Sequence, residues 1–194
     1  RDLLALYKSV GSLPYIKKAF VGSGVRYDLL LKENNPSAGR DEEHYLKELI
    51  ISHTSGRLKV APEHTDDEIL FLMRKSSFRH FRKLREKFSE IVRNNGLKYE
   101  LVPYFISAHP GTTEEKMGAL ARELKGLGLH PEQVQDFTPT PMTLATAMYY
   151  LGFDPYTGKK VHVARDIAEK RRQKDYFFNQ KGERQKAKGK KWGQ

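Results

Sequence analysis

Polar side chains gather at four places in the sequence where an apolar run gives way to a loop. The clearest is LVPYFISAHPGTTEEKM (101–117), in which Ser107 and His109 follow the apolar run and precede a Pro-Gly break. The other three places offer Ser23, Gly24 and Arg26, then Glu63 and His64, then Gln135, Asp136 and Thr138. Such side chains can hydrogen-bond or pair with a phosphate, a carboxylate or a sugar. They would form one site only if the fold brings them together.

The elements around these residues must provide that arrangement. Each of the segments 17–28, 57–73, 101–117 and 131–152 is predicted to start with a strand, which is only brief in 131–152. The clearest helical patterns lie in 41–53, 77–96 and 112–127. Strands that alternate with helices indicate an α/β fold with parallel strands, either an open doubly wound sheet or part of a (β/α) barrel. In both, ligands bind at the carboxyl ends of the strands, so we expect one shared site.

Two of the predicted helices begin with the spacing of a capping box. Thr112 precedes Glu115 by three residues, and Thr65 precedes Glu68 in the same way. At this spacing the hydroxyl and the carboxylate satisfy each other's free backbone N–H groups. The positive end of a helix after residue 112 would favour an anion beside the preceding strand. The alternative is an ordinary connection between a strand and a helix, since most capping boxes bind nothing.

Length and composition limit the class of protein. The 194 residues are 38% hydrophobic, and no run of about 18 apolar residues occurs, so we expect a cytoplasmic protein without a membrane-spanning helix. Cysteine is absent, which excludes disulfides, thiolate metal sites and cysteine nucleophiles from this chain. No His-x3-His or His-Glu-x2-His spacing occurs, so we predict no metal ligands. The chain starts at Arg1 with helix-like residues, and we expect it to begin within a longer protein.

The positive charge is concentrated near the C-terminus. Of the net charge of +11, the residues from Lys159 onward carry +9, with 13 basic and four acidic side chains. We expect a βα body over 1–158, a helical extension over 159–180 and a disordered basic tail over 181–194, which has almost nothing to bury. A basic tail can bind nucleic acid such as RNA, although most such tails are simply solvated.

Each candidate side chain also has a structural interpretation. Glu63 could bind ribose hydroxyls or only complement a helix dipole. His109 could hold a ligand or pack structurally, and Arg26 could bind a carboxylate or phosphate or form a salt bridge at the rim. The glycines around Ser23 would let a ligand approach the backbone closely, but a tight turn explains them as well. Lys59 either pairs with Glu63 inside a barrel or lies near the solvent-exposed start of its strand.

Four stretches of the sequence closely resemble the later half of YgiQ-type radical S-adenosylmethionine proteins, also designated UPF0313. The likeness extends from residue 1 to roughly residue 178 and is carried by KKAFVGSGVRYDLLL, LKVAPEHTDDEILFLMRKSSFRHF, PYFISAHPGTTEEKM and QVQDFTPTPMTLATAMYYLGFDPYTGK. The stretch 101–117 is also similar, more loosely, to methylthiotransferase-like radical enzymes, in which a Pro-Gly-Glu-Thr run follows the fifth barrel strand. Thr112 stands in place of that Glu.

The resemblance implies part of a (β/α)6 TIM-like radical SAM barrel, with this chain supplying strands three to six. In that family a Cys-x3-Cys-x2-Cys loop after the first strand holds a 4Fe-4S cluster, and reductive cleavage of S-adenosylmethionine yields a 5′-deoxyadenosyl radical. This chain has no cysteine and cannot hold the cluster by itself, so we expect an inactive C-terminal fragment whose partner is the rest of its parent chain. The substrate is unknown. The expected cofactor contacts are Ser23, Glu63, His64, Ser107, His109 and Gln135, and the expected substrate contacts are Arg26, Asp136 and Thr138.

A second hypothesis is a non-catalytic module that binds RNA or another polyanion through its βα body and basic tail. Cysteines encoded immediately upstream in the parent gene would favour the enzyme. Binding whose affinity falls steeply with salt would favour the module.

Overall fold

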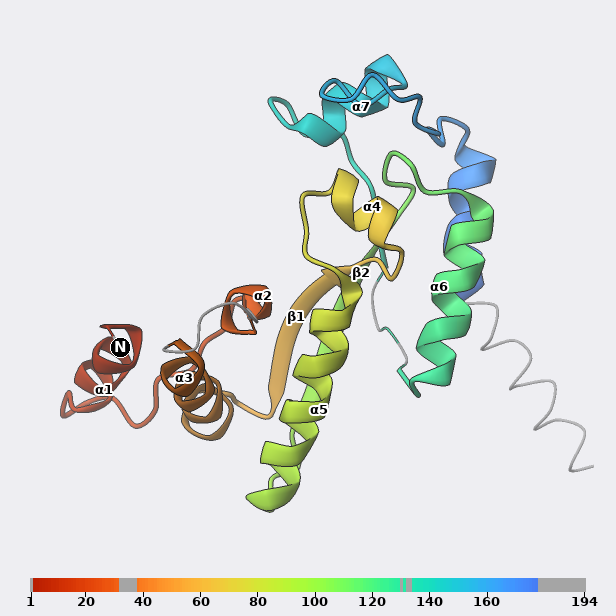
Figure 1. The fold of residues 1–194 in the computed structure, drawn as a ribbon. Coiled ribbons are helices and arrows are strands. Elements are labelled where there is room, and N and C mark those ends of the chain that lie inside the picture. Colours follow the sequence, from red (N-terminus) through yellow and green to blue (C-terminus); the bar gives the residue numbers. More distant parts are fainter. Residues whose placement is uncertain (1, 32–37, 130, 132–133, 178–194) are drawn as a thin grey trace, which may run out of the picture. The chain divides into compact units, whose positions relative to one another are not determined.

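The computed structural model describes residues 2–31, 38–129, 131 and 134–177, which form two compact units (Figure 1). Unit 1 comprises the described residues up to Pro62 together with Phe78–Pro103, and unit 2 comprises Glu63–Ser77 together with the described residues from Tyr104 onward. The chain contains a three-stranded sheet in the order β1-β2-β3, formed by β1 (Arg57–Glu63), β2 (Glu100–Ser107) and β3 (Val134–Asp136). Helices and this sheet confirm the predicted α/β class.

Unit 1 is built around one amphipathic helix. Its helices are α1 (Asp2–Gly11), α2 (Tyr27–Leu30), α3 (Ala38–Ser52) and α5 (Phe78–Asn94). Every third or fourth residue of α5 is apolar, so these side chains fall on one face and are removed from water. The buried stripe consists of Phe78, Phe81, Leu84 and Phe88, and the buried residues Leu46, Leu49 and Ile50 come from α3. The helices predicted in 41–53 and 77–96 are therefore confirmed.

The strand predicted in 17–28 is wrong for the described structure. The segment forms only an isolated parallel bridge, between Val25 and Val60 of β1, and its last two residues begin α2. Val25 N–H donates to Lys59 O at 3.2 Å, while Val21 N–H donates to His53 O at 2.9 Å, outside the sheet. Gly22 and Gly24 flank the exposed Ser23 and supply no side chain to pack, which weakens a strand at this point.

Unit 2 contains the remaining helices. These are α4 (Asp67–Leu72), α6 (Glu114–Gly126) and α7 (Leu144–Leu151), and residues 167–177 are also helical. Met117, Leu120 and Leu124 of α6 are buried, as their spacing predicts. β3 runs parallel to β2, with Phe105 opposite Val134 and Ser107 opposite Asp136. Two strand ends of unit 2 therefore lie next to each other.

Both predicted capping boxes are displaced by one residue. Helix α4 begins after Asp66, whose carboxylate accepts hydrogen bonds from the N–H groups of Glu68 and Ile69. Helix α6 begins after Thr113, whose hydroxyl accepts from Lys116 N–H at 3.3 Å. In both places two neighbouring residues can cap a helix, and the capping-box rule selected the wrong member of each pair.

The described residues do not test the predictions for the C-terminal tail and for the barrel. The tail 181–194 and the end of the predicted extension 159–180 are not among the described residues, and the barrel over 1–158 stays a prediction. Within the described part of the chain, none of the helices has the length and apolar character needed to cross a bilayer.

Candidate functional site

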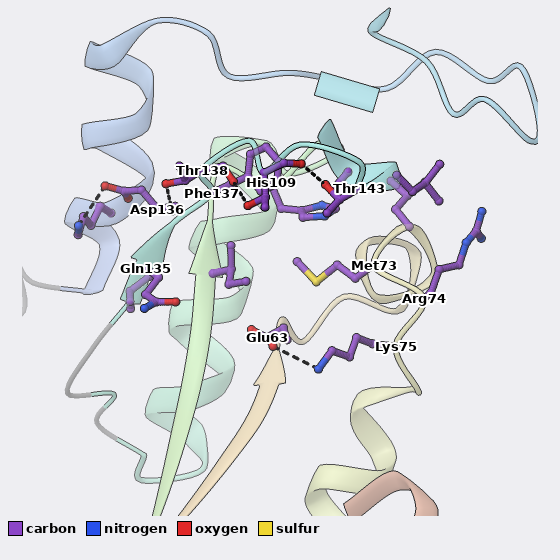
Figure 2. Close-up of a pocket in the computed structure, with 17 residues that line it drawn as sticks. Glu63, Met73, Arg74, Lys75, His109, Gln135, Asp136, Phe137, Thr138 and Thr143 are labelled. Carbon is purple, nitrogen blue, oxygen red and sulfur yellow. Dashed lines mark hydrogen bonds and ion pairs between the residues drawn. The ribbon is translucent and has the colours of Figure 1, made fainter. Parts of the chain in front are cut away.

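The ends of all three strands contribute to one open cavity of about 1080 Å³ in unit 2, here called the strand-end pocket (Figure 2). Glu63 comes from the end of β1, and Ile106 and His109 come from β2 and the loop after it. The sequence interpretation predicted from the parallel βα pattern that four segment ends would share one site, and the cavity contains residues from three of them. The side chains that line the pocket are Glu63, Leu72, Met73, Arg74, Lys75, Ile106, His109, Val134, Gln135, Asp136, Phe137, Thr138, Thr140, Thr143, Leu144, Ala145 and Lys174.

Glu63 occupies a strained position at the tip of β1. Its φ of 67° lies in the left-handed region, which is costly for a residue with a Cβ. Its carboxylate lies 3.2 Å from Lys75 Nζ, and Figure 2 shows this pair at the base of the pocket with Met73 pointing into the cavity above it. Burial raises the pKa of Glu63, and the Lys75 ammonium opposes that rise. The pair gives the pocket one carboxylate and one ammonium side by side.

Lys59 does not pair with Glu63. It is exposed on β1, while Leu58 and Val60 are buried on either side of it, so the alternative of a solvent-exposed strand start is the correct one. Because side chains alternate along a strand, Lys59 and Glu63 share a face, but Lys75 lies closer to Glu63 through the loop after α4.

His109 is presented by a tightly fixed loop, residues 108–112. Its neighbour Ala108 has a φ of 57°, and Gly111 a φ of 94°. The His109 ring is buried, lies 5.2 Å from the Phe137 ring in an edge-to-face arrangement, and has Nδ1 at 2.8 Å from Pro110 O. A carbonyl only accepts, so Nδ1 carries the proton and Nε2 is left as an acceptor. Burial lowers the pKa of His109 to about 4, which keeps the imidazole neutral at physiological pH.

The end of β3 supplies the second charged pair of the pocket. Asp136 accepts a hydrogen bond from Ser107 Oγ at 2.6 Å and pairs with Lys174 Nζ at 3.1 Å. Gln135 and Thr138 lie on either side of it in sequence, and both line the pocket with exposed side chains. Amide, carboxylate and hydroxyl groups from β3 and the loop after it are therefore available to a ligand.

Three of the predicted cofactor residues do not line this pocket, and two of them, Ser107 and His64, belong to unit 2. Ser107 is buried and directs its hydroxyl to Asp136, so it fixes that carboxylate within the protein. His64 is fully buried, and its Nδ1 accepts from Asp66 N–H at 2.9 Å. Burial lowers the pKa of His64 to about 4, with the nearby Asp66 carboxylate acting against it. Its Nε2 has no hydrogen-bond partner among the described residues.

The remaining two predicted residues, Ser23 and Arg26, belong to unit 1. Both are exposed and line a separate cavity of about 510 Å³ there. The Arg26 guanidinium makes two hydrogen bonds to Asp28, at 2.9 and 2.8 Å, which corresponds to the salt-bridge alternative. Those bonds and the Asp28 charge raise the pKa of Arg26.

The sequence interpretation missed the residues that face the predicted ones. Lys75, Lys174 and Met73 line the pocket, and Gln173 holds the loop 108–112 from behind. Lys75 and Lys174 lie in stretches rich in basic residues, where no single lysine stands out. Gln173 lies in a helix expected to be only an extension, and a lone amide gives no pattern to detect.

Comparison with known proteins finds relatives along nearly the whole chain. Residues 132–182 match the family model described as a domain of unknown function, DUF3362. The chain is 52% identical over 185 residues, 95% of its length, to the UPF0313 protein of Bacteroides thetaiotaomicron, and 52% identical over 181 residues to that of Porphyromonas gingivalis. It is 44% identical over 174 residues to the UPF0313 protein of Methanosarcina acetivorans.

Nearly the whole chain matches one part of UPF0313 proteins. It covers 30%, 28% and 22% of the length of these three relatives, so they are much longer than the chain. The segment that matches DUF3362 supplies ten of the 17 pocket residues, from Val134 to Ala145 and at Lys174. The segment that matches this domain of unknown function therefore contributes one wall of the strand-end pocket.

Proposed function

We propose that this chain forms the later part of the barrel of a radical S-adenosylmethionine enzyme, and that its strand-end pocket binds the cofactor and part of the substrate. The observation that carries the proposal is the convergence of three strand ends on one cavity of about 1080 Å³. Parallel α/β folds bind their ligands at this edge. The proposal also follows from the sequence resemblance described above.

Backbone strain supports a ligand site at this edge. Four residues other than glycine have a positive φ among the described residues: Glu63, Arg74, Ala108 and Met142. Glu63 ends β1, Ala108 follows β2, and Arg74 lines the pocket. Strained backbone of this kind collects at functional sites, where the rest of the fold holds it in place.

The residues present fit S-adenosylmethionine. Glu63 offers a carboxylate to ribose hydroxyls, and His109 Nε2 and Gln135 offer further hydrogen bonds to polar groups of the cofactor. Asp136 and Thr138 face the same cavity and are the proposed substrate contacts. When bound to its cluster, the cofactor would supply radical abstraction of a substrate hydrogen.

The residues do not fit the cluster. Iron-sulfur clusters are held by cysteine thiolates, and this chain contains none. We therefore assign the cluster to the longer protein of which we propose this chain to be a part. The contribution of the chain is to bind and orient ligands, with His64 and Ser107 supporting the pocket wall from the protein side.

The test uses the full-length, cluster-loaded protein and measures S-adenosylmethionine binding by equilibrium dialysis. Glu63→Gln and His109→Leu, which keeps most of the buried volume of the ring, should each weaken binding about ten- to a hundredfold, because each removes one hydrogen bond worth roughly 1–3 kcal/mol. Cluster content and melting temperature should stay nearly unchanged.

The matched control is Glu115→Gln, which makes the same chemical change on the exposed surface of α6. Its binding should equal that of the unmodified protein. Full affinity in both pocket variants would exclude the pocket as the cofactor site, and an equal loss of binding and melting temperature would show that the two residues are structural.

A further inference from the structure

The helix formed by residues 167–177 packs closely on α6 within unit 2. At Gly118 of α6, an added Cβ would lie 3.3 Å from the Tyr176 ring, so the small residue permits the approach. Arg172 pairs with Glu114 at 2.8 Å on the exposed side of the same contact. This helix is part of the segment that matches DUF3362. Within this helix, Gln173 contacts the loop after β2, and Lys174 contacts the end of β3.

Gln173 bridges the two ends of the loop 108–112. Its side chain is 0% exposed. Its Oε1 accepts from Ala108 N–H at 2.9 Å, and its Nε2 donates to Thr112 O at 3.1 Å. One amide therefore satisfies a buried donor and a buried acceptor that lie four residues apart. An apolar side chain of the same size would leave both backbone groups without these partners.

The loop needs such support because its first residue is strained. Ala108 has a φ of 57°, a conformation that residues with a Cβ rarely adopt. The next residue is His109, whose ring orientation and Nδ1 bond to Pro110 O depend on the path of this backbone. Lys174 acts in parallel, since its ammonium pairs with Asp136 at the end of β3.

We infer that Gln173 is a positioning residue of the strand-end pocket, whose amide holds the loop 108–112 in the conformation that presents His109 Nε2 to the ligand. This gives the helical part of the DUF3362 match a function, the clamping of a ligand-binding loop. The inference rests on the proposed function for the identity of the ligand, but its geometry and its test do not involve S-adenosylmethionine.

The test records nitrogen-15 NMR spectra of the histidine rings in the full 194-residue chain, which report the ring tautomer directly. In the unmodified chain His109 should show the single Nδ1–H tautomer. In Gln173→Met, which keeps the side-chain length but removes both polar groups, that signature should be replaced by a mixture of tautomers. Exchange of the Ala108 amide proton should accelerate at least about tenfold, because its acceptor is lost.

Two further variants separate positioning from a general loss of structure. Arg172→Met, at the adjacent position, should leave both the tautomer and the exchange rate unchanged. Ala108→Gly in the Gln173→Met background should restore the single tautomer, since glycine adopts a positive φ without strain.

An unchanged His109 tautomer in Gln173→Met overturns the inference, as does an equal effect of Arg172→Met. If Gln173→Met unfolds the chain, recovery of the fold and the tautomer by Ala108→Gly supports the inference, and continued unfolding overturns it. Since no cofactor is present in these spectra, failure of this inference is distinguishable from failure of the binding test above.

Discussion

The two units hold their predicted site residues in different ways. In unit 2, Asp136 is held by Ser107, 29 residues earlier, and by Lys174, 38 residues later. In unit 1, Arg26 is held by Asp28, two residues away, and Ser23 is exposed. The distant partner Ser107 is buried and fixed by the fold, whereas the Arg26 guanidinium of the local pair is exposed to water. Two positions that were both predicted as strand ends therefore differ: in unit 2 the side chains are fixed by residues distant in sequence, and in unit 1 they are exposed at the edge of a smaller cavity.

The largest expected effect tests how far the pocket loop depends on α6. Met117→Ala should lower the free energy of unfolding by about 2–5 kcal/mol, because it leaves a cavity under a helix that follows directly from the loop 108–112. Met117 is 0% exposed, whereas Met142 is fully exposed, so Met142→Ala is the matched control. The control should change stability by less than about 0.5 kcal/mol. Denaturant unfolding measures the change in both variants. Similar values would mean that the packing of α6 contributes little to the stability of unit 2.

A second test uses the two buried imidazoles at the strand ends of unit 2. The pKa values of His64 and His109 are both lowered by burial to about 4, from an ordinary value of 6.5. Between these values the unfolded chain binds protons that the folded chain does not. The free energy of unfolding should therefore fall as pH drops from about 6.5 to 4, by on the order of 2–3 kcal/mol per imidazole. The groups whose charges act on His64 are Asp66, Lys116 and His109.

The double variant His64→Gln, His109→Gln should flatten this pH dependence, measured as denaturant midpoints across the same range. Ser107→Ala should keep the slope, since it leaves both imidazoles in place. A slope that survives in the double variant would assign the acid sensitivity to other groups.

Some parts of the fold could be predicted from the sequence. The apolar stripe from Phe78 to Phe88 predicted α5, because burying this stripe outweighs the local preferences of the other residues in the segment. The parallel βα pattern predicted that strand ends would meet, and Glu63, His109 and Asp136 do line one cavity. Cap positions depend on small differences between neighbouring side chains, and those predictions were displaced by one residue.

What could not be predicted are contacts between side chains far apart in the sequence. Gln173 and Lys75 acquire their roles from tertiary packing, since neither belongs to a periodic pattern or to a motif. The segment 17–28 failed for a related reason. Its apolar residues have the pattern of a strand. Gly22 and Gly24, however, supply no side chains that could pack and stabilise a strand in the sheet.

A third test compares Ser107 and Ser23, which were both predicted to contact the cofactor. Ser107→Ala removes the hydrogen bond to Asp136 and should lower the free energy of unfolding by about 1–2 kcal/mol, since the serine is buried and the acceptor is charged. Ser23→Ala, on the exposed loop of unit 1, should change it by less than about 0.5 kcal/mol. Thermal and denaturant unfolding measure the difference. Equal losses would show that the loop of unit 1 is as firmly held as the pocket.

The smallest expected effect concerns ion pairs. Lys116 in unit 2 pairs with Asp66 at 3.1 Å and with Glu68 at 2.6 Å, and so joins α6 to the start of α4. Lys116→Met should lower the free energy of unfolding by no more than about 1 kcal/mol, because water screens a partly exposed pair. Arg26→Met should produce no measurable change, since its guanidinium is fully exposed and its partner is local. Raising the salt concentration to about 1 M shortens the screening length to about 3 Å and should reduce the Lys116 effect further. An Arg26 effect as large as that of Lys116, at either salt concentration, would mean that the ion pair of unit 1 contributes to its fold and that the contrast between the two units does not extend to charge.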